Sequence, residues 1–243
     1  MMERLIYSIL LIPLMWVMVS CRCPKQCECT DLSNTRCINK GITDGDLAEI
    51  ARNLDPEVQF LHLERNDITH FKAEDFIKST KLRKVFLTEN SLTKVPVNIS
   101  HFLPAVFELQ LGKNKIHAIG QTDFEGYHSI TYLDISGNNI QKLGSGIFQT
   151  IPNLDTLNAM NNGIKRLENG VFKGLTKAKN IYLNGNGLTS IEPEVFEELP
   201  SLETVYLQDN KLVCDCTLYH VINSLHALSN FKNLKGKCNE VWT

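Results

Sequence analysis

Apolar residues recur along this chain in a frame that repeats every 24 positions. Each unit reads apolar, two variable residues, apolar, one variable, apolar, two variable, asparagine, one variable, apolar. Apolar residues on either side of one variable residue have the period of a strand with one buried face. The frame therefore predicts seven short strands, each followed by one of the asparagines Asn66, Asn90, Asn114, Asn138, Asn162, Asn186 and Asn210.

Two more columns of apolar residues keep the same interval. The first column lies five residues after an asparagine and consists of Val95, Ile119, Leu143, Leu167 and Ile191. The second is aromatic and consists of Phe124, Phe148, Phe172 and Phe196. A single unit cannot bury its own apolar residues, so we expect the units to stack and their strands to form a parallel sheet. The leucine rows should fill the interior and the phenylalanines should pack under the opposite wall. Ala159 and Ala178 depart mildly from the frame.

The asparagines require a separate explanation, because a buried amide is unfavourable unless its hydrogen bonds are made. The chain turns just after each strand, which leaves backbone groups unpaired. An asparagine side chain can bond those groups in its own and the neighbouring unit. We therefore predict a ladder of structural, non-catalytic asparagines. The alternative, seven solvated loop positions, fits poorly with their fixed register.

These units resemble the 24-residue leucine-rich repeats of extracellular proteins, with the signature L-x-x-L-x-L-x-x-N-x-L. The resemblance covers residues 58–213 directly. It implies an α/β repeat solenoid: a leucine-rich repeat horseshoe with a parallel concave sheet, an irregular convex side and disulfide caps. No cofactor is expected.

Residues 1–21 have the features of a signal peptide. A short polar segment with Arg4 precedes LIYSILLIPLMWVMV, an apolar core of the length found in signal peptides and short for a membrane span. We place the cleavage after Cys21 or after Ser20; the alternative is an uncleaved membrane anchor. No second apolar stretch reaches spanning length, so we expect a secreted, extracellular mature chain without a membrane span.

Four cysteines follow in residues 22–57, and the secretory route favours disulfides over a zinc site. The pattern resembles the N-terminal cap of the extracellular family, which shields the apolar edge of the first repeat. That resemblance implies the pairs Cys23 with Cys29 and Cys27 with Cys37. The segment between Cys37 and the first repeat looks longer than is usual in the family.

Residues 214–243 resemble the C-terminal cap of the same family. Helical spacing predicts a short amphipathic helix through Leu218, Val221, Ile222, Leu225 and Leu228. The resemblance implies a bond between Cys214 and Cys238. The fourth cysteine of such caps is missing before Thr243, so we expect a truncated cap in which Cys216 has lost its usual partner. Two explanations stay open: a disulfide through Cys216 to another chain, giving a homo- or heterodimer, or a longer product that supplies the fourth cysteine.

The chain shows no enzyme signature. Its seven histidines form no H-E-x-x-H motif, and there is no G-x-S-x-G sequence or Walker loop. The net charge of −2 and the pI of about 6.4 argue against a nucleic-acid partner. We therefore expect a binding protein and not an enzyme.

The open concave face is the candidate binding surface. Its strand positions form two columns: Phe60, Lys84, Glu108, Tyr132, Thr156, Asn180 and Thr204, and His62, Phe86, Gln110, Asp134, Asn158, Tyr182 and Tyr206. The predicted protein-binding residues are Phe60, His62, Phe86, Gln110, Tyr132, Asp134, Asn158, Tyr182 and Tyr206. Tyrosine and phenylalanine offer large contact areas with few torsions to freeze. The alternative is that these aromatics merely suit a β-sheet.

The size of this face limits what it can bind alone. Seven strands at a spacing of roughly 4.8 Å give a face about 34 Å long and, with short strands, on the order of 450 Å². A partner usually covers about 800 Å² on each side. Flanking loops, a cap or a second subunit should therefore contribute. The sequon Asn98-Ile99-Ser100 predicts a glycan on the far side of the second repeat.

Two functions of different classes follow. The first is a secreted recognition module that binds an extracellular protein or glycan on the concave face, as in innate-immune, matrix or cell-surface signalling families. The second is a structural scaffold or disulfide-linked dimer without a concave-face ligand. A receptor ectodomain fragment is a third hypothesis, which the sequence downstream of Thr243 would test.

Overall fold

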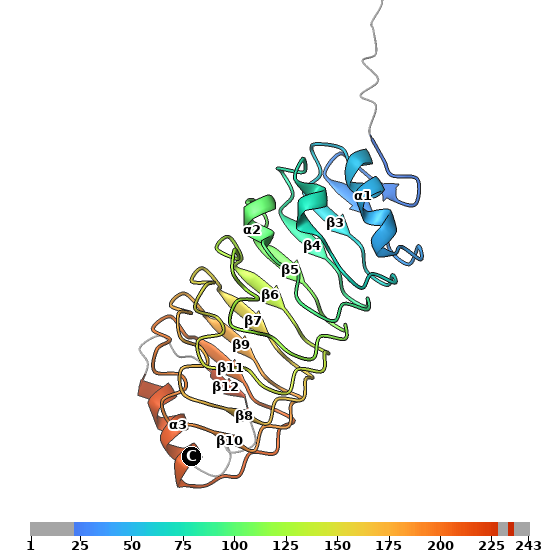
Figure 1. Cartoon of the computed structure of the whole chain (residues 1–243). Coiled ribbons are helices and arrows are strands. Elements are labelled where there is room, and N and C mark those ends of the chain that lie inside the picture. The colour runs from blue at the N-terminus through green and yellow to red at the C-terminus, as the bar shows by residue number, and fades with distance from the viewer. Residues whose placement is uncertain (1–21, 228–232, 236–243) are drawn as a thin grey trace, which may run out of the picture.

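A computed structural model describes residues 22–227 and 233–235, and it shows a curved solenoid (Figure 1). Within those residues ten strands form one sheet in the order β1-β2-β3-β4-β5-β6-β7-β9-β11-β12. The seven predicted strands are β3 (Phe60–His62), β4 (Lys84–Phe86), β5 (Glu108–Gln110), β6 (Tyr132–Asp134), β7 (Thr156–Asn158), β9 (Asn180–Tyr182) and β11 (Thr204–Tyr206). The predicted signal peptide, residues 1–21, lies outside the described residues.

These strands pair in parallel with residues 24 positions apart directly opposite each other. In each, the central residue is buried and its two neighbours are half-buried. The side-chain period of two explains this pattern, since successive side chains point to opposite faces of a sheet. The predicted interior is confirmed, including Ala159 and Ala178, which are fully buried.

The sheet is longer than the seven strands predicted from the repeats. Strand β2 (Asn34–Arg36) pairs in parallel with β3, and β12 (Asn233–Lys235) pairs in parallel with β11. Strand β1 (Glu28–Cys29) adds to β2 in the antiparallel direction. Strand β2 was not predicted because its unit departs from the 24-residue interval. Thr35 pairs with Leu61, 26 residues later, and this buried threonine replaces the usual leucine.

The long segment before the first repeat contains helix α1 (Asp44–Asn53), which the sequence analysis did not predict. The Asp46 carboxylate accepts bonds from the Thr43 N–H and hydroxyl, both at 2.8 Å, and so fixes the start of the helix. Leu47, Ile50 and Ala51 form its buried side. This helix covers the end of the core that the first repeat would otherwise expose.

Two disulfides hold the chain before α1. They join Cys23 to Cys29 and Cys27 to Cys37, which are the pairs that the family resemblance implies. Cys37 is fully buried in the core, so the second bond ties the N-terminal segment directly to the solenoid interior.

The convex side is built from short, irregular elements. These are the 3-10 helix η1 (Ala73–Phe76), the one-turn helix α2 (Ile99–Phe102) and the two-residue strands β8 (Arg166–Leu167) and β10 (Ser190–Ile191), which pair with each other. The predicted phenylalanine column is confirmed: Phe124, Phe148, Phe172 and Phe196 are buried and stack with ring centroids 5.5–6.2 Å apart.

Ser100 takes the place of a phenylalanine in this column. Its side chain is buried, and its Oγ lies 2.6 Å from the Ser129 Oγ and accepts the Ser129 N–H. The hydrogen bonds satisfy the polar group where a ring would otherwise pack. Nearby, the buried Tyr127 hydroxyl donates to the Pro96 carbonyl oxygen at 2.5 Å.

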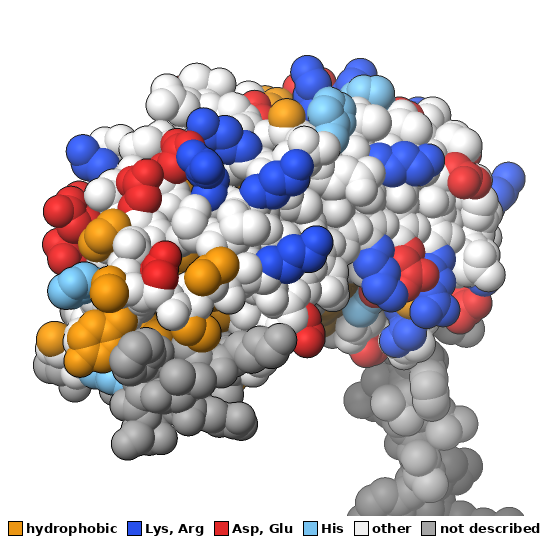
Figure 2. All heavy atoms as spheres, turned by 90° about the horizontal axis from the view of Figure 1, so that it is seen from below, with side chains coloured by type: hydrophobic (Ala, Val, Ile, Leu, Met, Phe, Trp, Pro, Cys, Tyr) orange, Lys and Arg blue, Asp and Glu red, His pale blue; other side chains and the backbone are white. Residues whose placement is uncertain are grey.

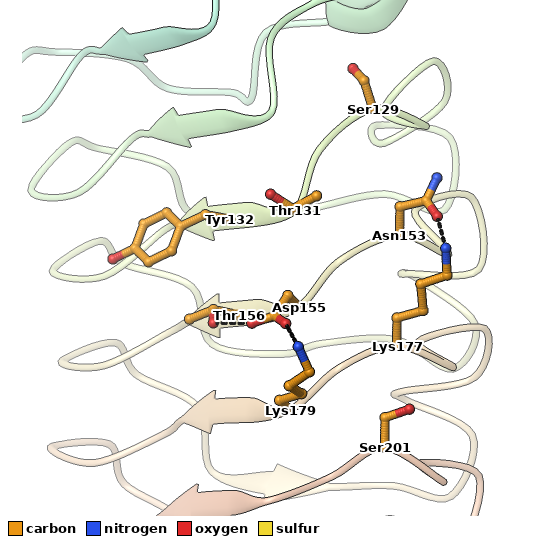
Figure 3. A pocket seen from close by; sticks show the side chains of 9 residues that line it. All are labelled: Ser129, Thr131, Tyr132, Asn153, Asp155, Thr156, Lys177, Lys179 and Ser201. Atoms are coloured by element: carbon orange, nitrogen blue, oxygen red, sulfur yellow. Dashed lines mark hydrogen bonds and ion pairs between the residues drawn. The ribbon is translucent and has the colours of Figure 1, made fainter.

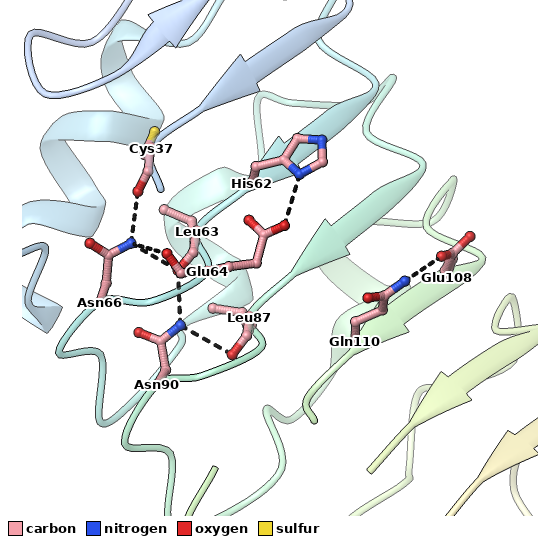
Figure 4. Close-up of polar contacts among 9 residues, drawn as sticks. All are labelled: Cys37, His62, Leu63, Glu64, Asn66, Leu87, Asn90, Glu108 and Gln110. Atoms are coloured by element: carbon pink, nitrogen blue, oxygen red, sulfur yellow. Dashed lines mark hydrogen bonds and ion pairs between the residues drawn. The ribbon is translucent and has the colours of Figure 1, made fainter. Parts of the chain in front are cut away.

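The asparagine ladder is confirmed. In the first two rungs, the Asn66 amide donates to the carbonyls of Cys37 and Leu63, and the Asn90 amide donates to those of Leu63 and Leu87 (Figure 4). A strand-end carbonyl such as that of Leu63 therefore accepts from the asparagine of its own unit and from that of the next unit. The amide oxygens accept backbone N–H groups of the preceding unit, as Asn90 does from Ile68.

Helix α3 (Cys216–Ala227) closes the C-terminal end, and Leu218, Val221, Ile222 and Leu225 are its buried residues, as predicted. Leu228 and Cys238 lie outside the described residues. Cys214 is engaged in a disulfide, whereas Cys216 is exposed and free. Among the described residues, no helix has the length and apolar character needed to cross a membrane.

Candidate functional site

The two predicted columns lie side by side on the exposed face of the sheet. Because residues 24 apart are in register, each column is a continuous row that runs along the solenoid. All nine predicted binding residues fall in these rows and all are half-buried. The rows carry different chemistry at their two ends and in the middle.

An aromatic stack lies at the N-terminal end. The His62 and Phe86 rings are nearly parallel with centroids 4.3 Å apart. His62 Nδ1 lies 3.0 Å from the Glu64 Oε1, as Figure 4 shows. The second carboxylate oxygen of Glu64 is buried and has no hydrogen-bond partner. Phe60 lies in the other row, beside Lys84.

Between the stack and the middle of the sheet lies an ion pair. Lys84 Nζ is 2.6 Å from the Glu108 Oε2. The Gln110 amide donates to the other oxygen of Glu108 at 2.8 Å, and Figure 4 marks this contact between Gln110 and Glu108. Lys84 also lies over the Phe107 ring, 5.6 Å from its centroid. This part of the face satisfies its own charges.

Tyrosines dominate the C-terminal half. The Tyr182 and Tyr206 rings stack with centroids 4.4 Å apart, and Tyr132 lies on the same face two strands before Tyr182. Burial, followed by the nearby Asp134 and Glu108 carboxylates, raises the pKa of Tyr132. Burial and then the Tyr206 phenol raise the pKa of Tyr182. Both hydroxyls are therefore protonated near neutral pH.

A third row was missed by the sequence analysis. It lies two residues after the second row, and the strand period puts it on the same face. Within it Glu64, Thr88, Asn184 and Gln208 each have a buried side-chain oxygen without a hydrogen-bond partner. The sequence does contain a signal for this row, since a polar residue comes after the leucine that directly follows the strand in four units, Leu63, Leu87, Leu183 and Leu207.

An open groove of about 640 Å³ runs along one edge of the sheet, where the chain enters the strands. Hydroxyl, amide and charged side chains line it (Figure 3). Lys177 donates to Asn153 at 2.7 Å, and Lys179 pairs with Asp155 at 2.5 Å. Each lysine ammonium thus has one partner within the groove. The Tyr132 ring extends away from them, toward the concave face.

The remaining predicted sites lie away from the concave face. Asn98 is exposed on the convex side, where it precedes α2 in a left-handed conformation with φ of 56°. Cys216 begins α3 at the C-terminal end. Within the part of the chain that the structure describes, no three His, Cys, Asp or Glu side chains group as metal ligands would.

Exposed hydrophobic side chains gather at the C-terminal end (Figure 2). Val213 is 64% exposed and Tyr219 is 39% exposed there. Elsewhere on the face in Figure 2, lysines and arginines lie interspersed with acidic side chains, which fits the small net charge. A broad basic surface of the kind that binds nucleic acid is not seen on this face.

Comparison with known proteins identifies the repeats. The family described as "Leucine rich repeat" matches residues 80–140, 104–164 and 152–212, which together span more than half of the chain. Leucine-rich repeat-containing protein 3B of cattle, mouse and human is 31% identical over 106 residues, covering 42% of this chain and 39% of each relative. The match thus spans well under half the length of these relatives.

Solved structures share the fold at low identity. The structure of a TLR13–ssRNA13 complex superposes with a TM-score of 0.71 at 21% identity, covering 82% of this chain and 30% of that one. Internalin C2 of Listeria monocytogenes gives a TM-score of 0.63 at 21% identity, covering 84% of this chain and 80% of that one. Both support the solenoid with a parallel concave sheet.

Proposed function

Since the chain belongs to the leucine-rich repeat family, we propose that it is a secreted recognition module that binds an extracellular protein on its concave face. Repeat solenoids of this kind serve protein–protein interaction through extended concave surfaces. The proposed setting is innate immunity, the matrix or cell-surface signalling.

The observation that supports this proposal is the composition of the exposed rows. Aromatic side chains stack at both ends, His62 on Phe86 and Tyr182 on Tyr206, and stay half-buried and open to solvent on one side. Each of these side chains has only two torsions, so a partner freezes few torsions when it contacts the stacks. Oxygens beside both stacks are buried without hydrogen-bond partners, and side-chain rotation would present them to a ligand.

Secretion is part of the proposal. The apolar segment in residues 1–21 and the two N-terminal disulfides support it, because such bonds persist in oxidising compartments. A glycan on Asn98 would stand on the convex side and leave the concave face open. The Ser100 hydroxyl is bonded inside the folded repeat, so the glycan would be added before α2 packs.

RNA is not the proposed ligand, although one structural neighbour is an RNA complex by its name. Nucleic-acid affinity comes mainly from cations that contact phosphates. Among the residues of the two exposed rows, Lys84 is the one lysine or arginine, and Glu108 already neutralises it. A glycan partner stays a second candidate, because the groove beside Tyr132 is lined by hydroxyl and amide groups.

The test compares two variants of the secreted chain. One replaces Phe86, Tyr182 and Tyr206 by alanine, and the matched control replaces the exposed convex residues Ile77 and Val97 by alanine. Each chain is immobilised, exposed to extracellular fluid, and the captured proteins are quantified by mass spectrometry.

We expect the concave variant to lose at least about tenfold of the partner signal, since buried aromatic anchors dominate protein interfaces. The convex control should capture the partner as the unmodified chain does. A partner that the concave variant retains and the convex control loses would refute the proposal.

A specific observation favours a second function as a covalent dimer. Cys216 is exposed and free, and it stands at the end of the solenoid where hydrophobic side chains gather. A disulfide between two chains would protect this thiol and extend the binding surface.

A further inference from the structure

Asp134 differs from the other carboxylates on the exposed face. Glu64 contacts His62, and Glu108 contacts Lys84. Asp134 accepts the Ser136 N–H at 2.8 Å, and among the described residues it forms no ion pair with a lysine, arginine or histidine. A half-buried carboxylate without a cationic partner loses part of its hydration and gains no Coulomb attraction in return. It is therefore suited to a cation supplied from outside.

Aromatic rings stand on both sides of this carboxylate. Tyr132 precedes it by two residues on the same strand and face. In the other direction the row continues through Asn158 to the stacked rings of Tyr182 and Tyr206. The faces of neutral phenol rings attract cations through their quadrupole. One side of Tyr182 is covered by Tyr206, and the other side faces Asn158.

Two amide oxygens next to the stack lack donors. They are the Asn184 Oδ1 and the Gln208 Oε1, each two residues beyond one of the stacked tyrosines and both without a hydrogen-bond partner. Leaving a buried acceptor unpaired is unfavourable, so a ligand rich in N–H groups would satisfy these oxygens after small side-chain rotations. The carboxylate, the rings and the amides thus favour the same kind of ligand: a cation with several donors.

We infer that Tyr132, Asp134, Tyr182, Asn184, Tyr206 and Gln208, here called the Asp134–tyrosine cluster, bind the extracellular protein partner, with an arginine side chain seated between Asp134 and Tyr182. The inference rests on the proposed function, because the partner must occupy the concave face.

The geometry favours arginine over lysine. Asn158 lies between Asp134 and Tyr182 in the row, so a guanidinium above it would be about one strand spacing, roughly 4.8 Å, from each. Its planar group can stack on the free side of Tyr182 while its edge donates to the carboxylate. It has five donors and no acceptor, which matches the carboxylate oxygen of Asp134 that accepts no hydrogen bond. Asn184 and Gln208 follow β9 and β11, two and three strands beyond Asp134, so their oxygens would accept other N–H groups of the same partner. A lysine ammonium offers three donors at one point and cannot stack.

The test uses small probes with the complete secreted chain. Ring resonances of the tyrosines are followed by NMR during titration with N-acetyl-arginine methylamide, its neutral isostere N-acetyl-citrulline methylamide, and N-acetyl-lysine methylamide. We expect saturable shifts of Tyr132 and Tyr182 with the arginine probe. The citrulline probe should bind about fivefold more weakly, the size expected of one partly exposed ion pair.

Two variants separate this site from general charge attraction. Asp134→Asn keeps an oxygen that can accept the Ser136 N–H, so the strand should stay folded, as amide spectra will report. It should lose the preference for arginine over citrulline. Glu125→Gln removes an exposed carboxylate from outside the cluster and should keep that preference.

Equal responses to arginine and citrulline, an equal or stronger response to lysine, or a preference that survives in Asp134→Asn would each overturn the inference. Failure here is distinguishable from failure of the proposed function. If no probe shows a preference but the concave triple variant still loses its partner, binding on this face stands and the arginine assignment is wrong. If arginine is preferred but the triple variant captures every partner normally, the proposed function is wrong.

Discussion

Replacing Asn138 by leucine tests the ladder that joins the repeats. Asn138 lies in the middle of the array and is only 5% exposed. Its Oδ1 accepts the Ile116 N–H at 3.0 Å, and its amide donates to the carbonyls of Leu111 and Ile135, both at 3.0 Å, and to that of Ser136 at 3.1 Å. Leucine has a similar size but can make none of these bonds.

The expected loss can be worked out bond by bond. The Leu111 carbonyl also accepts from Asn114, the Ile135 carbonyl from Asn162 and the Ser136 carbonyl from the Lys113 N–H, so each keeps one donor in the variant. The Ile116 N–H has no second acceptor among the described contacts and would be left unpaired in the interior. One orphaned buried donor costs about 1 to 3 kcal/mol of unfolding free energy.

Urea unfolding followed by circular dichroism measures this loss. With a denaturant slope of about 3 kcal/mol/M, the midpoint should fall by roughly 0.3 to 1 M. The matched control is Asn139→Leu, since Asn139 is the next residue and its side chain is exposed. Equal midpoints for Asn138→Leu and the unmodified chain, within error, would refute the account of the ladder.

Three further predictions concern other parts of the molecule. Tyr127→Phe leaves the Pro96 carbonyl without its 2.5 Å bond, so thermal or urea unfolding should show a loss of about 1 to 3 kcal/mol; no loss would mean that water replaces the hydroxyl. Partial burial raises the pKa of Asp44, but bonds led by the Thr69 hydroxyl outweigh it and lower the pKa to about 2. Because the folded pKa is the lower one, the contribution of Asp44 to stability is complete above about pH 4 and is lost as the pH falls toward 2. The protection factors of the α1 amides, which correct for the slower intrinsic exchange in acid, should therefore fall over that window in the unmodified chain and much less in Asp44→Asn; identical profiles would contradict this. Cys216 should link two chains, so non-reducing electrophoresis should show a dimer that reduction or Cys216→Ser abolishes; a single monomeric band in all samples would end the dimer hypothesis.

The repeat frame was sufficient to predict the parts of the fold that depend on period alone. Strand positions, the buried asparagines and the phenylalanine column follow from residue type at a fixed interval, because each unit packs only against its neighbours. Strand β2 does not obey this rule. Its unit is offset by two residues and has Thr35 where a leucine is usual, so no count of leucines could detect it. Helix α1 lies in the same offset unit and depends on local capping by Thr43 and Asp46.

The candidate site was predictable in position but not in chemistry. The side-chain period of two places both Asp134 and Glu108 on the exposed face and does not distinguish their roles. Only side-chain contacts distinguish them, since Lys84 neutralises Glu108 and no basic residue among those described pairs with Asp134. The unpaired oxygens of Asn184 and Gln208 are likewise a result of rotamers and neighbours. Periodicity assigns a residue to a surface, whereas charge balance on that surface depends on distances of a few ångströms.

The buried positions stabilise the solenoid and the exposed positions form its surface, so one scaffold can carry a specific site at little cost to its stability. The central residue of each strand is buried, and the ladder satisfies the turns behind it, so neither depends on the half-buried positions that flank the central residue. Removing Tyr182 or Asp134 leaves that core and those bonds in place. Side chains in the exposed rows can therefore lack an ionic partner, as Asp134 does among the described residues, at a cost that the rest of the solenoid tolerates. If the arginine inference holds, a cation from the partner would supply the Coulomb attraction that Asp134 lacks within the described chain.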